Sequence, residues 1–303
     1  MADLTLITGG AGFIGSHLAE RLLARGYRVR VLDNLSFGRR EWVPAGTELI
    51  EGDIRNLEDC RRACAGVVGI FHMAAMSRAG PSIDAIDTCT QQNIVGTQNI
   101  LIAARDAEVR KFIYSGSSTF YGNRPPPHHE DTPADFLNFY ALSKAAGEQY
   151  CLMFDRLFDL PVTVLRYFNV YGPRQPQTGA YALVLGIFLR RKFENQPLEI
   201  HGSGAQRRDF VHVRDVANAN LAAFESRHHG RIYNVGSGTN ISVRELADMI
   251  SSRQAHGPRR AGDAEVTLAD ITCIRSELGW RPQVPFDVGL RELTELMAKG
   301  EQA

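Results

Sequence analysis

The sequence has no excess of charge of either sign and no apolar run long enough to cross a membrane. Lys and Arg together number 34, Asp and Glu also number 34, and this balance disfavours binding to nucleic acid or to an anionic membrane. The longest apolar run, YALVLGIFL at 181–189, is about half of the roughly 20 residues that a spanning helix needs. A strand-like segment, LTLIT, begins at Leu4, where a secretory signal would need a basic and then an apolar leader. We therefore expect a cytoplasmic protein that binds neither nucleic acid nor membrane.

Cysteine is scarce and irregularly spaced. The five cysteines, at positions 60, 64, 89, 151 and 273, form no C-x-x-C motif, and an odd number cannot pair off within one chain. Cys60 and Cys64 could share a helix face, but buried free thiols are the commoner reason for such a pair. The adjacent histidines at 128–129 and 228–229 point in different directions rather than toward one ion. We predict no metal site.

Short apolar or β-branched runs alternate with longer amphipathic runs through the first half of the chain. This alternation predicts a doubly wound parallel sheet, a Rossmann-type α/β domain that binds its ligands at the carboxyl ends of the strands. The expected strands are 4–8, 29–33, 48–52, 67–72, 111–116 and 162–166, and the expected helices 13–25, 56–65, 82–106 and 138–158. After Arg166 the rhythm breaks into a Pro- and Gly-rich stretch, a helix-like 180–193 and a short strand, PLEIHG. We expect a first domain at 1–168 and a smaller mixed α/β domain at 169–303, with 209–233 packing back onto the first.

A glycine-rich turn joins the first expected strand to the first expected helix. Glycines at 9, 10, 12 and 15 satisfy the dinucleotide pattern G-x-G-x-x-G and the wider G-x-x-G-x-x-G. Such a turn lets the backbone approach a pyrophosphate, whose charge the positive end of the helix stabilises. Glycine also serves tight turns for conformational reasons alone. Here the strand before the turn and the helix after it favour the dinucleotide interpretation.

An acid at the end of the second expected strand agrees with that interpretation. Asp33 follows Gly15 by 18 residues, where a carboxylate accepts hydrogen bonds from ribose hydroxyls and repels a 2′-phosphate. NAD is therefore favoured over NADP, although Arg39 and Arg40 are counter-evidence unless they are solvated loop charges. Asp53 is either a contact for the adenine edge or an N-cap for the next helix.

Tyr140 and Lys144 stand four residues apart at the expected start of a helix. This spacing places two side chains one turn apart on one helix face. An ammonium group beside a phenol favours the phenolate and makes the tyrosine a better base near neutral pH. Most pairs with this spacing are surface decoration, so the spacing permits the chemistry without establishing it.

The motifs, taken together and in order, resemble the extended short-chain dehydrogenase/reductase superfamily, and more narrowly its NAD-dependent UDP-sugar 4-epimerases of the UDP-glucose/galactose type. They are TGGAGFIGSHL, VLDN, GDI, FHMAA, SGSSTFYG, YALSK, RYFNVYGPRQ, RRDFVHVRDV and LADITCIRSELGW. The resemblance covers nearly the whole chain. It implies that Tyr140 takes the proton from the sugar 4-hydroxyl, that Lys144 holds the nicotinamide ribose, and that NAD accepts and returns the hydride of a transient 4-keto sugar.

Further site residues follow from the same resemblance. Ser117 is expected to relay the proton of the sugar O4, and Ser118 and Thr119 to line its pocket; alone, this loop would indicate a turn capping its own backbone. The expected NAD contacts are Gly9, Gly12, Phe13, Ile14, Gly15, Asp33, Asn34, Asp53, Ile54, Met73, Ala74, Ala75, Asn93, Ser115, Tyr140, Lys144 and Tyr167. The expected substrate contacts are Ser117, Asn169, Val184, Leu185, Ile200, His201, Arg208, Arg260 and Asp263. Arg207 and Arg259 replace the two arginines if the correspondence slips by one residue.

The residues around Ser117 also bear on the reaction. Relatives that dehydrate the sugar carry Asp-Glu at the place of Ser118-Thr119, and relatives that decarboxylate a glucuronate carry Glu at the place of Thr119. Relatives that epimerise glucuronate tend to place an arginine after the GPRQ motif, where this chain has PQTGAY, although Arg190 and Arg191 lie nearby. A neutral hexose is favoured. Thr267 stands where a large tyrosine in some relatives excludes N-acetylhexosamines, and because threonine is small, UDP-N-acetylhexosamines are further expected substrates.

These observations predict a 4-epimerase that interconverts UDP-glucose and UDP-galactose. The alternatives are an epimerase of UDP-glucuronate or a dTDP-sugar, a one-way 4-ketoreductase, and a non-enzymatic NAD-sensing scaffold. The resemblance further implies a homodimer formed by the helices at 82–106 and 138–158. Their apolar faces could equally be core within one chain.

Overall fold

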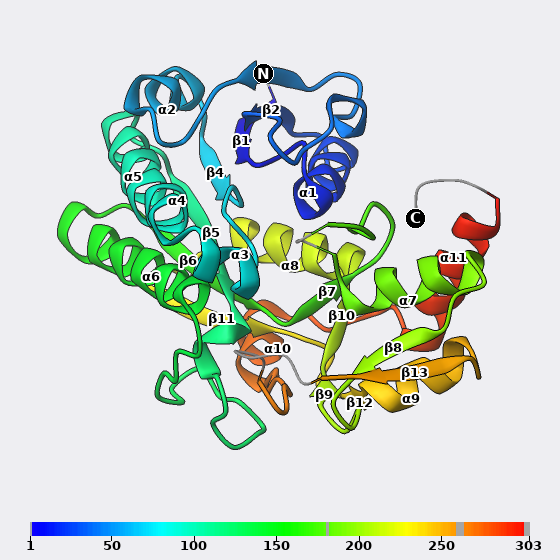
Figure 1. Ribbon diagram of the computed structural model, residues 1–303. Coiled ribbons are helices and arrows are strands. Elements are labelled where there is room, and N and C mark those ends of the chain that lie inside the picture. Colours follow the sequence, from blue (N-terminus) through cyan, green and yellow to red (C-terminus); the bar gives the residue numbers. More distant parts are fainter. Residues whose placement is uncertain (1, 180–181, 259–263, 300–303) are drawn as a thin grey trace.

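A parallel sheet of seven strands forms the centre of the computed structural model (Figure 1). The structure describes residues 2–179, 182–258 and 264–299. The strand order across the sheet is β3-β2-β1-β4-β5-β6-β11, and every neighbouring pair is parallel. The bounds are β1 Leu4–Thr8, β2 Arg28–Asp33, β3 Glu48–Glu51, β4 Gly69–His72, β5 Lys111–Ser117, β6 Val162–Tyr167 and β11 Arg231–Val235. The predicted doubly wound α/β fold is confirmed.

Helices cover both faces of this sheet. Helices α1 (Phe13–Ala24) and α8 (Val213–Glu225) lie on one face, and α2 (Leu57–Cys64), α5 (Gly96–Asp106) and α6 (Phe139–Phe158) on the other (Figure 1). Successive residues of β1 enter opposite cores: Leu6 packs with the α2–α5–α6 side and Ile7 with the α1–α8 side. A strand with two buried faces needs apolar residues at successive positions, which is why LTLIT has so little alternation.

The segment predicted as one helix over 82–106 is broken into four parts. They are α3 (Ala79–Asp84), α4 (Ile86–Thr90), a π-helical segment (Gln91–Val95) and α5. Ala85, between the first two, has φ −134° and ψ 63°, outside the helical region. A π-helical turn inside a helix often marks a functional site. In this chain the π-helical segment carries Asn93, whose side chain bonds to the loop after β4.

The second half of the chain adds α8 and β11 to the sheet domain and builds a smaller mixed region beside it (Figure 1). Three two-stranded sheets form there: β7 (Asn169–Tyr171) with β10 (Phe210–His212), β8 (Leu198–His201) with β13 (Gln254–Gly257), and β9 (Arg207–Arg208) with β12 (Ile241–Ser242). Its helices are α7 (Val184–Phe193), α9 (Val243–Ile250) and α11 (Phe286–Ala298), whereas α10 (Thr272–Leu278) packs on β11 and its Ile274 joins the core of the sheet domain. Helices α7, α9 and α11 share a core with β8 and β10. The predicted helix at 180–193 begins at Val184, and positions 180–181 lie outside the described residues.

Two further findings concern membrane-spanning helices and metal sites. Across the described ranges, no helix combines the length and apolarity needed to cross a bilayer, and no three His, Cys, Asp or Glu side chains are arranged to hold a metal ion. All five cysteines are free thiols, and only Cys273 is not fully buried.

Candidate active site

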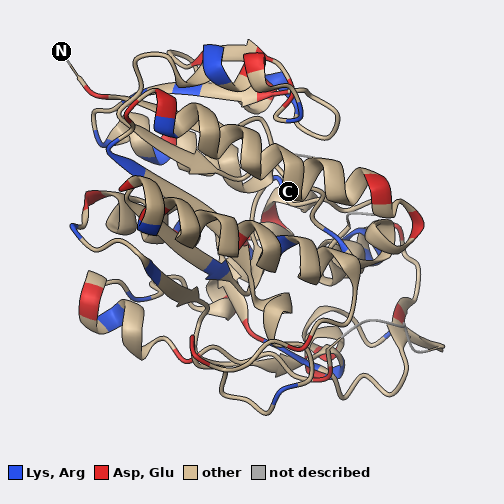
Figure 2. Ribbon diagram, turned by 90° about the vertical axis from the view of Figure 1, so that its left-hand side faces the viewer, with Lys and Arg blue, Asp and Glu red and all other residues tan. Residues whose placement is uncertain are grey.

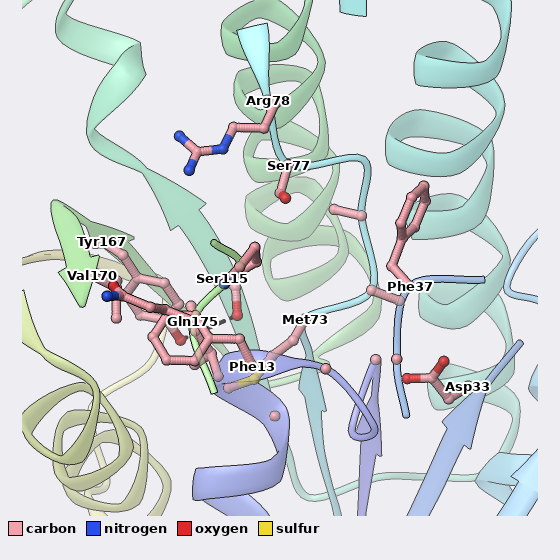
Figure 3. Close-up of a pocket in the computed structure, with 18 of the residues that line it drawn as sticks. Phe13, Asp33, Phe37, Met73, Ser77, Arg78, Ser115, Tyr167, Val170 and Gln175 are labelled. Carbon is pink, nitrogen blue, oxygen red and sulfur yellow. Dashed lines mark hydrogen bonds between the residues drawn. The ribbon is translucent and has the colours of Figure 1, made fainter. Parts of the chain in front are cut away.

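A cleft of about 990 Å³ opens at the carboxyl edge of the sheet, where residues following β1, β2, β4, β5 and β6 meet. Its volume is near the upper end of the roughly 300–1,000 Å³ typical of small-molecule sites. Figure 3 shows Asp33 at one end of this cleft, Phe13, Tyr167 and Gln175 at another, and Arg78 directed into it from the loop after β4. Its volume and its many polar lining residues leave room for two ligands.

The glycine turn at the end of β1 forms the floor of the cleft. Gly9 has φ +71°, a conformation that side chains disfavour, and a Cβ there would lie 2.8 Å from the Ala74 nitrogen. A Cβ on Gly15 would lie 2.4 Å from the Gly9 oxygen, so glycine allows α1 to pack against the turn. Helix α1 begins after Gly12 without a side-chain cap. Its first N–H groups are therefore available to an anion such as a pyrophosphate.

Asp33 closes the end of the cleft beside this turn. Its carboxylate is only 8% exposed and accepts hydrogen bonds from the backbone N–H of Ala11 at 3.0 Å and of Leu35 at 2.8 Å. Burial raises the pKa of Asp33, and the two backbone hydrogen bonds oppose that rise. A carboxylate has about four acceptor positions, so the positions left over suit ribose hydroxyls.

Asp53 is the second carboxylate that lines the cleft at this end. Arg55 and Asn34 both donate to its carboxylate, and chiefly because of Arg55 the pKa of Asp53 falls to about 2. Arg40 forms an ion pair with Glu51 and does not line the cleft. Arg39 does line it, with its guanidinium 5.1 Å from the ring centre of Trp42.

Tyr140 enters the cleft from the first turn of α6. The helix is capped by Asn138, whose side chain accepts the Ala141 N–H at 2.9 Å. Burial raises the pKa of Tyr140, while a hydrogen bond with Ser117 and the positive charge of Arg78 lower it. Ser117 also bonds to the Thr119 hydroxyl at 2.9 Å. Tyr140, Ser117 and Thr119 therefore form one hydroxyl cluster at the carboxyl end of β5.

Lys144 lies one turn farther along α6 and is 5% exposed. Its ammonium stands 4.3 Å from the ring centre of Tyr114, a cation–π contact. Burial lowers the pKa of Lys144 to about 8. A Cβ on Gly147 would lie 2.2 Å from the Tyr114 hydroxyl. The lysine expected to act on Tyr140 thus packs on Tyr114, a ring that a glycine allows close to the helix.

A buried ion pair fixes α6 against the sheet below this cluster. Arg166 on β6 donates to Glu148 on α6 at 2.6 and 2.9 Å, and both side chains are 2% exposed. Arg166 also donates to the Tyr121 hydroxyl at 2.8 Å and to the Glu130 carbonyl at 3.0 Å. Because Glu148 follows Lys144 by four residues, the pair holds the face of α6 that carries Lys144 against β6.

The cleft brings together most of the predicted site residues. All the expected NAD contacts except Asn93 line it, as do Ser117, Ser118, Thr119 and Asn169. Asn93 is buried behind it and bonds to Met76 and Ser143. Five expected substrate residues are elsewhere in the smaller region: Val184, Leu185, Ile200, His201 and Arg208 do not line the cleft. Arg260 and Asp263 lie outside the described residues.

Several of these residues have structural surroundings that explain their positions. Leu185 and Ile200 belong to the core of the smaller region. Arg208 donates to the carbonyls of Arg207 and Glu265, and the hydroxyl of Thr267 accepts from Asn169 at 2.9 Å. Arg190 and Arg191 pair with Glu194 and Glu199 and do not reach the cleft.

Two polar residues stand out among the lining residues that were not predicted from the sequence. Gln175, in the GPRQ motif, is 3% exposed, and neither atom of its side-chain amide has a hydrogen-bond partner among the described residues. Such an amide needs a partner when buried, and a bound dinucleotide would supply polar groups. Arg78 follows the fourth strand by six residues, a position where the carboxyl-end rule could have identified it. The glycine turn, the uncapped helix, Asp33 and Gln175 together fit a dinucleotide.

Comparisons with known proteins agree with this geometry. A model of the NAD dependent epimerase/dehydratase family matches residues 5–236. A UDP-glucose 4-epimerase of Mycolicibacterium smegmatis is 36% identical over 317 residues, covering 98% of this chain and 99% of that enzyme. The crystal structure of a Thermotoga maritima UDP-glucose 4-epimerase with UDP-glucose has a TM-score of 0.94 and 33% identity, covering 98% of this chain and 99% of the other. That of a Thermus thermophilus UDP-glucose 4-epimerase with NAD has a TM-score of 0.90 and 34% identity, covering 96% and 98%.

Proposed function

Because the chain belongs to the NAD-dependent epimerase/dehydratase family, we propose that it is a 4-epimerase that interconverts UDP-glucose and UDP-galactose. The observation that carries the proposal is the hydroxyl cluster of Tyr140, Ser117 and Thr119 at the carboxyl edge, in the same cleft as the glycine turn and Asp33. A base beside a dinucleotide site is what removal of a hydroxyl proton together with a hydride requires.

The cofactor lies, in this proposal, along the glycine turn. Asp33 binds the adenosine ribose, the N-terminus of α1 binds the pyrophosphate, and Lys144 holds the nicotinamide ribose near Tyr140. Bound NAD supplies the hydride acceptor for C4 of the sugar and afterwards the hydride donor. The buried side-chain amide of Gln175 forms hydrogen bonds with the same ligand.

The proton of the sugar 4-hydroxyl moves to the Tyr140 oxygen, with Ser117 as the relay. Ser117 bonds to the Thr119 hydroxyl and its hydroxyl lowers the pKa of Tyr140; a serine hydroxyl can donate to one oxygen while accepting from another. Tyr140 needs positive charge nearby to release its own proton, because burial raises its pKa above the ordinary value of 10. When the sugar is reduced from its other face, Tyr140 returns the proton to O4.

The acids of the cleft favour epimerisation over dehydration or decarboxylation. Among the described lining residues the carboxylates are Asp33 and Asp53, and both belong to the end that we assign to the adenosine. Elimination of water or handling of a sugar carboxylate needs a further acid–base group beside the tyrosine, and positions 118 and 119 carry hydroxyls instead. The small, buried Thr267 leaves N-acetylhexosamines as additional substrates. UDP-glucuronate and dTDP-sugars are the alternatives that a panel of substrates separates.

In this proposal each half of the chain binds mainly one ligand, and Gln175 is the residue of the second half that contacts NAD. Residues 1–168, with 209–233 packed onto them, bind NAD, and residues 169–303 bind the nucleotide sugar. Asn169 lies where the two meet, since it lines the cleft and bonds to Thr267 and to the Asp209 carbonyl. We keep His201, Arg208, Arg260 and Asp263 as the proposed contacts of the uridine diphosphate.

We further propose that the protein is a homodimer through α6. Figure 2 shows the face of the molecule that carries α5 and α6, and the two helices run across it with few charged residues. The exposed residues of α6 include Phe139, Leu142, Tyr150, Met153 and Leu157. Their spacing of three, four or seven to eight positions places them on one side of a helix. Analytical ultracentrifugation of the protein and of Leu157→Glu tests this, with a monomeric wild type as the contrary result.

One assay tests the proposed reaction against its rivals. The protein is given UDP-glucose without NADH, and UDP-galactose is measured; turnover without added reductant supports epimerisation, whereas a stoichiometric demand for NADH supports a ketoreductase. A panel of UDP-hexoses, UDP-hexosamines, UDP-glucuronate and dTDP-glucose then defines the sugar. Tyr140→Phe is expected to reduce turnover at least about 100-fold. Tyr150→Phe, which removes an exposed phenol from the same helix, is the control. Unchanged turnover in Tyr140→Phe would refute the catalytic assignment.

A further inference from the structure

The segment that runs from the loop after β4 into α3 is fastened to α6 at two places. At the near end, the Asn93 side chain accepts the Met76 N–H at 2.7 Å and donates to the Met76 carbonyl and to the Ser143 hydroxyl, each at 2.9 Å. At the far end, the Ser82 hydroxyl accepts the Tyr140 N–H at 3.0 Å. Segment 76–82 therefore lies against the first turn of α6, with one fastening at the backbone N–H of Tyr140 and the other, through Asn93, at Ser143.

Arg78 stands between these two fastenings. Figure 3 shows its guanidinium extending from the loop into the cleft, near Ser77 and on the opposite side from Asp33. Both Arg78 and Tyr140 line the cleft. The short loop and its anchors limit how far the arginine can move from the tyrosine, so its position is a consequence of the fold rather than of a free surface side chain.

The groups that act on the pKa of Tyr140 come from several elements. Arg78 faces it from the loop, Cys89 from α4 and Ser117 from β5; Arg78 and Ser117 lower the pKa of Tyr140, and Cys89 raises it. On its own helix the nearest cation is Lys144, whose ammonium packs on the Tyr114 ring. Arg78 is therefore the cation whose charge lowers the pKa of Tyr140.

The two cations also differ in how long they remain charged as the pH rises. The pKa of Lys144 is about 8, so its ammonium loses the proton in mildly alkaline solution. A guanidinium stays protonated throughout that range. A persistent positive charge beside a buried phenol stabilises the phenolate, which is the form that accepts the substrate proton.

We propose that Arg78 is a positioning residue that stabilises ionised Tyr140 and so prepares it to take the proton of the sugar hydroxyl. The inference rests on the proposed function for its catalytic meaning, but the electrostatic link between Arg78 and Tyr140 does not depend on which sugar binds. Arg78 acts through Tyr140 rather than on the substrate directly.

The test compares the wild type with Arg78→Gln and Arg78→Lys as holoenzymes. With UDP-glucose as substrate, kcat is measured across pH 6 to 10. For Arg78→Gln we expect the acidic limb to move up by about one pH unit, so that kcat on that limb falls about 10-fold, while the Michaelis constant changes less than about 3-fold. Arg78→Lys retains a cation and should recover most of the loss. Arg62→Gln removes an exposed arginine from α2 and is the control for net charge.

A second readout follows the phenol itself. Ultraviolet difference titration reports phenolate formation, and subtracting the curve of Tyr140→Phe, or of Tyr140→Phe combined with Arg78→Gln, isolates Tyr140 in each background. We expect the isolated transition to occur at higher pH in Arg78→Gln than in the wild type. This measurement needs no turnover, so it tests the link even if the wild type proves inactive on every UDP-sugar, an outcome that would refute only the proposed function.

Two results would overturn the inference. One is an acidic limb and a Tyr140 transition that do not move in Arg78→Gln. The other is a Michaelis constant that increases at least 10-fold while both transitions stay unmoved, which would make Arg78 a substrate-binding residue instead.

Discussion

Replacing Lys144 by methionine should stabilise the cofactor-free protein at neutral pH while abolishing turnover. Lys144 is 5% exposed, and burial lowers its pKa from 10.5 to about 8. Its ammonium is therefore held in the folded protein at a cost in free energy. Methionine has nearly the same length and carries no charge, so it keeps the packing against Tyr114 and removes that cost. Residues retained for function often lower stability in this way.

The size of the effect follows from the lowered pKa. The difference between 10.5 and about 8, at 1.36 kcal/mol for each pH unit, corresponds to about 3 kcal/mol. Below pH 8 both the folded and the unfolded chain carry the charge, and the full cost applies. Between pH 8 and 10.5 the unfolded chain binds more protons than the folded one at this position, so the wild type gains stability as the pH rises. The advantage of Lys144→Met should thus be largest at pH 7 and vanish near pH 10.5.

Urea unfolding followed by circular dichroism measures this difference. The free energy of unfolding is determined for the wild type and Lys144→Met at pH 7 and pH 10.5, without NAD. The exposed Lys192→Met is the control and should show no such pH dependence. Added NAD should stabilise the wild type more than the variant, because a ligand that binds only the folded state adds more stability the more tightly it binds. A variant that is no more stable at pH 7, or equally favoured at both pH values, would refute the reasoning.

Three further changes test the surroundings of the site. Gly147→Ala would place a Cβ 2.2 Å from the Tyr114 hydroxyl, so we expect slower turnover and lower stability by about 1–3 kcal/mol in urea unfolding, despite the higher helix propensity of alanine; a more stable variant would contradict this. Asp33→Ala removes a carboxylate that accepts two backbone N–H groups and that we assign to the adenosine ribose. NAD affinity measured by calorimetry should therefore fall at least about 10-fold. Unchanged affinity would remove Asp33 from the cofactor site. Glu148→Gln leaves the buried charge of Arg166 without its partner, which should cost about 3–5 kcal/mol in the same unfolding assay, and a loss below about 1 kcal/mol would show that solvent reaches the pair.

The six strands expected in the first half of the chain were found because their signal is local. Each is a short run with apolar residues at successive positions, bounded by a turn, and burial on both faces makes that run continuous. The seventh strand, β11, was not identified as a strand. It begins with the exposed Arg231 and pairs with β6, more than 60 residues earlier in the chain. No local sequence pattern therefore indicates a strand there. The expected long helix also breaks at Ala85, whose backbone is not helical.

The members of the site were predictable to a larger extent than their interactions. The carboxyl-end rule and the motifs located the glycine turn, Asp33, Ser117 and Tyr140 in one cleft. The spacing of Tyr140 and Lys144 fixes a shared helix face but not which neighbour packs against the Lys144 ammonium. Tyr114 arrives there from β5, 30 residues before Lys144, and only the folded chain shows that the ammonium packs on its ring.

The two sides of helix α6 have different surroundings. The side that meets the sheet carries Lys144 and Glu148, whereas the outward side presents a stripe of large apolar groups such as Leu142 and Leu157. A rod of 20 residues transmits a rotation about its axis to both sides at once. A partner that packs on the apolar stripe would consequently also affect the orientation of Tyr140. Substitutions on one side of the helix would be constrained by the contacts of the other side.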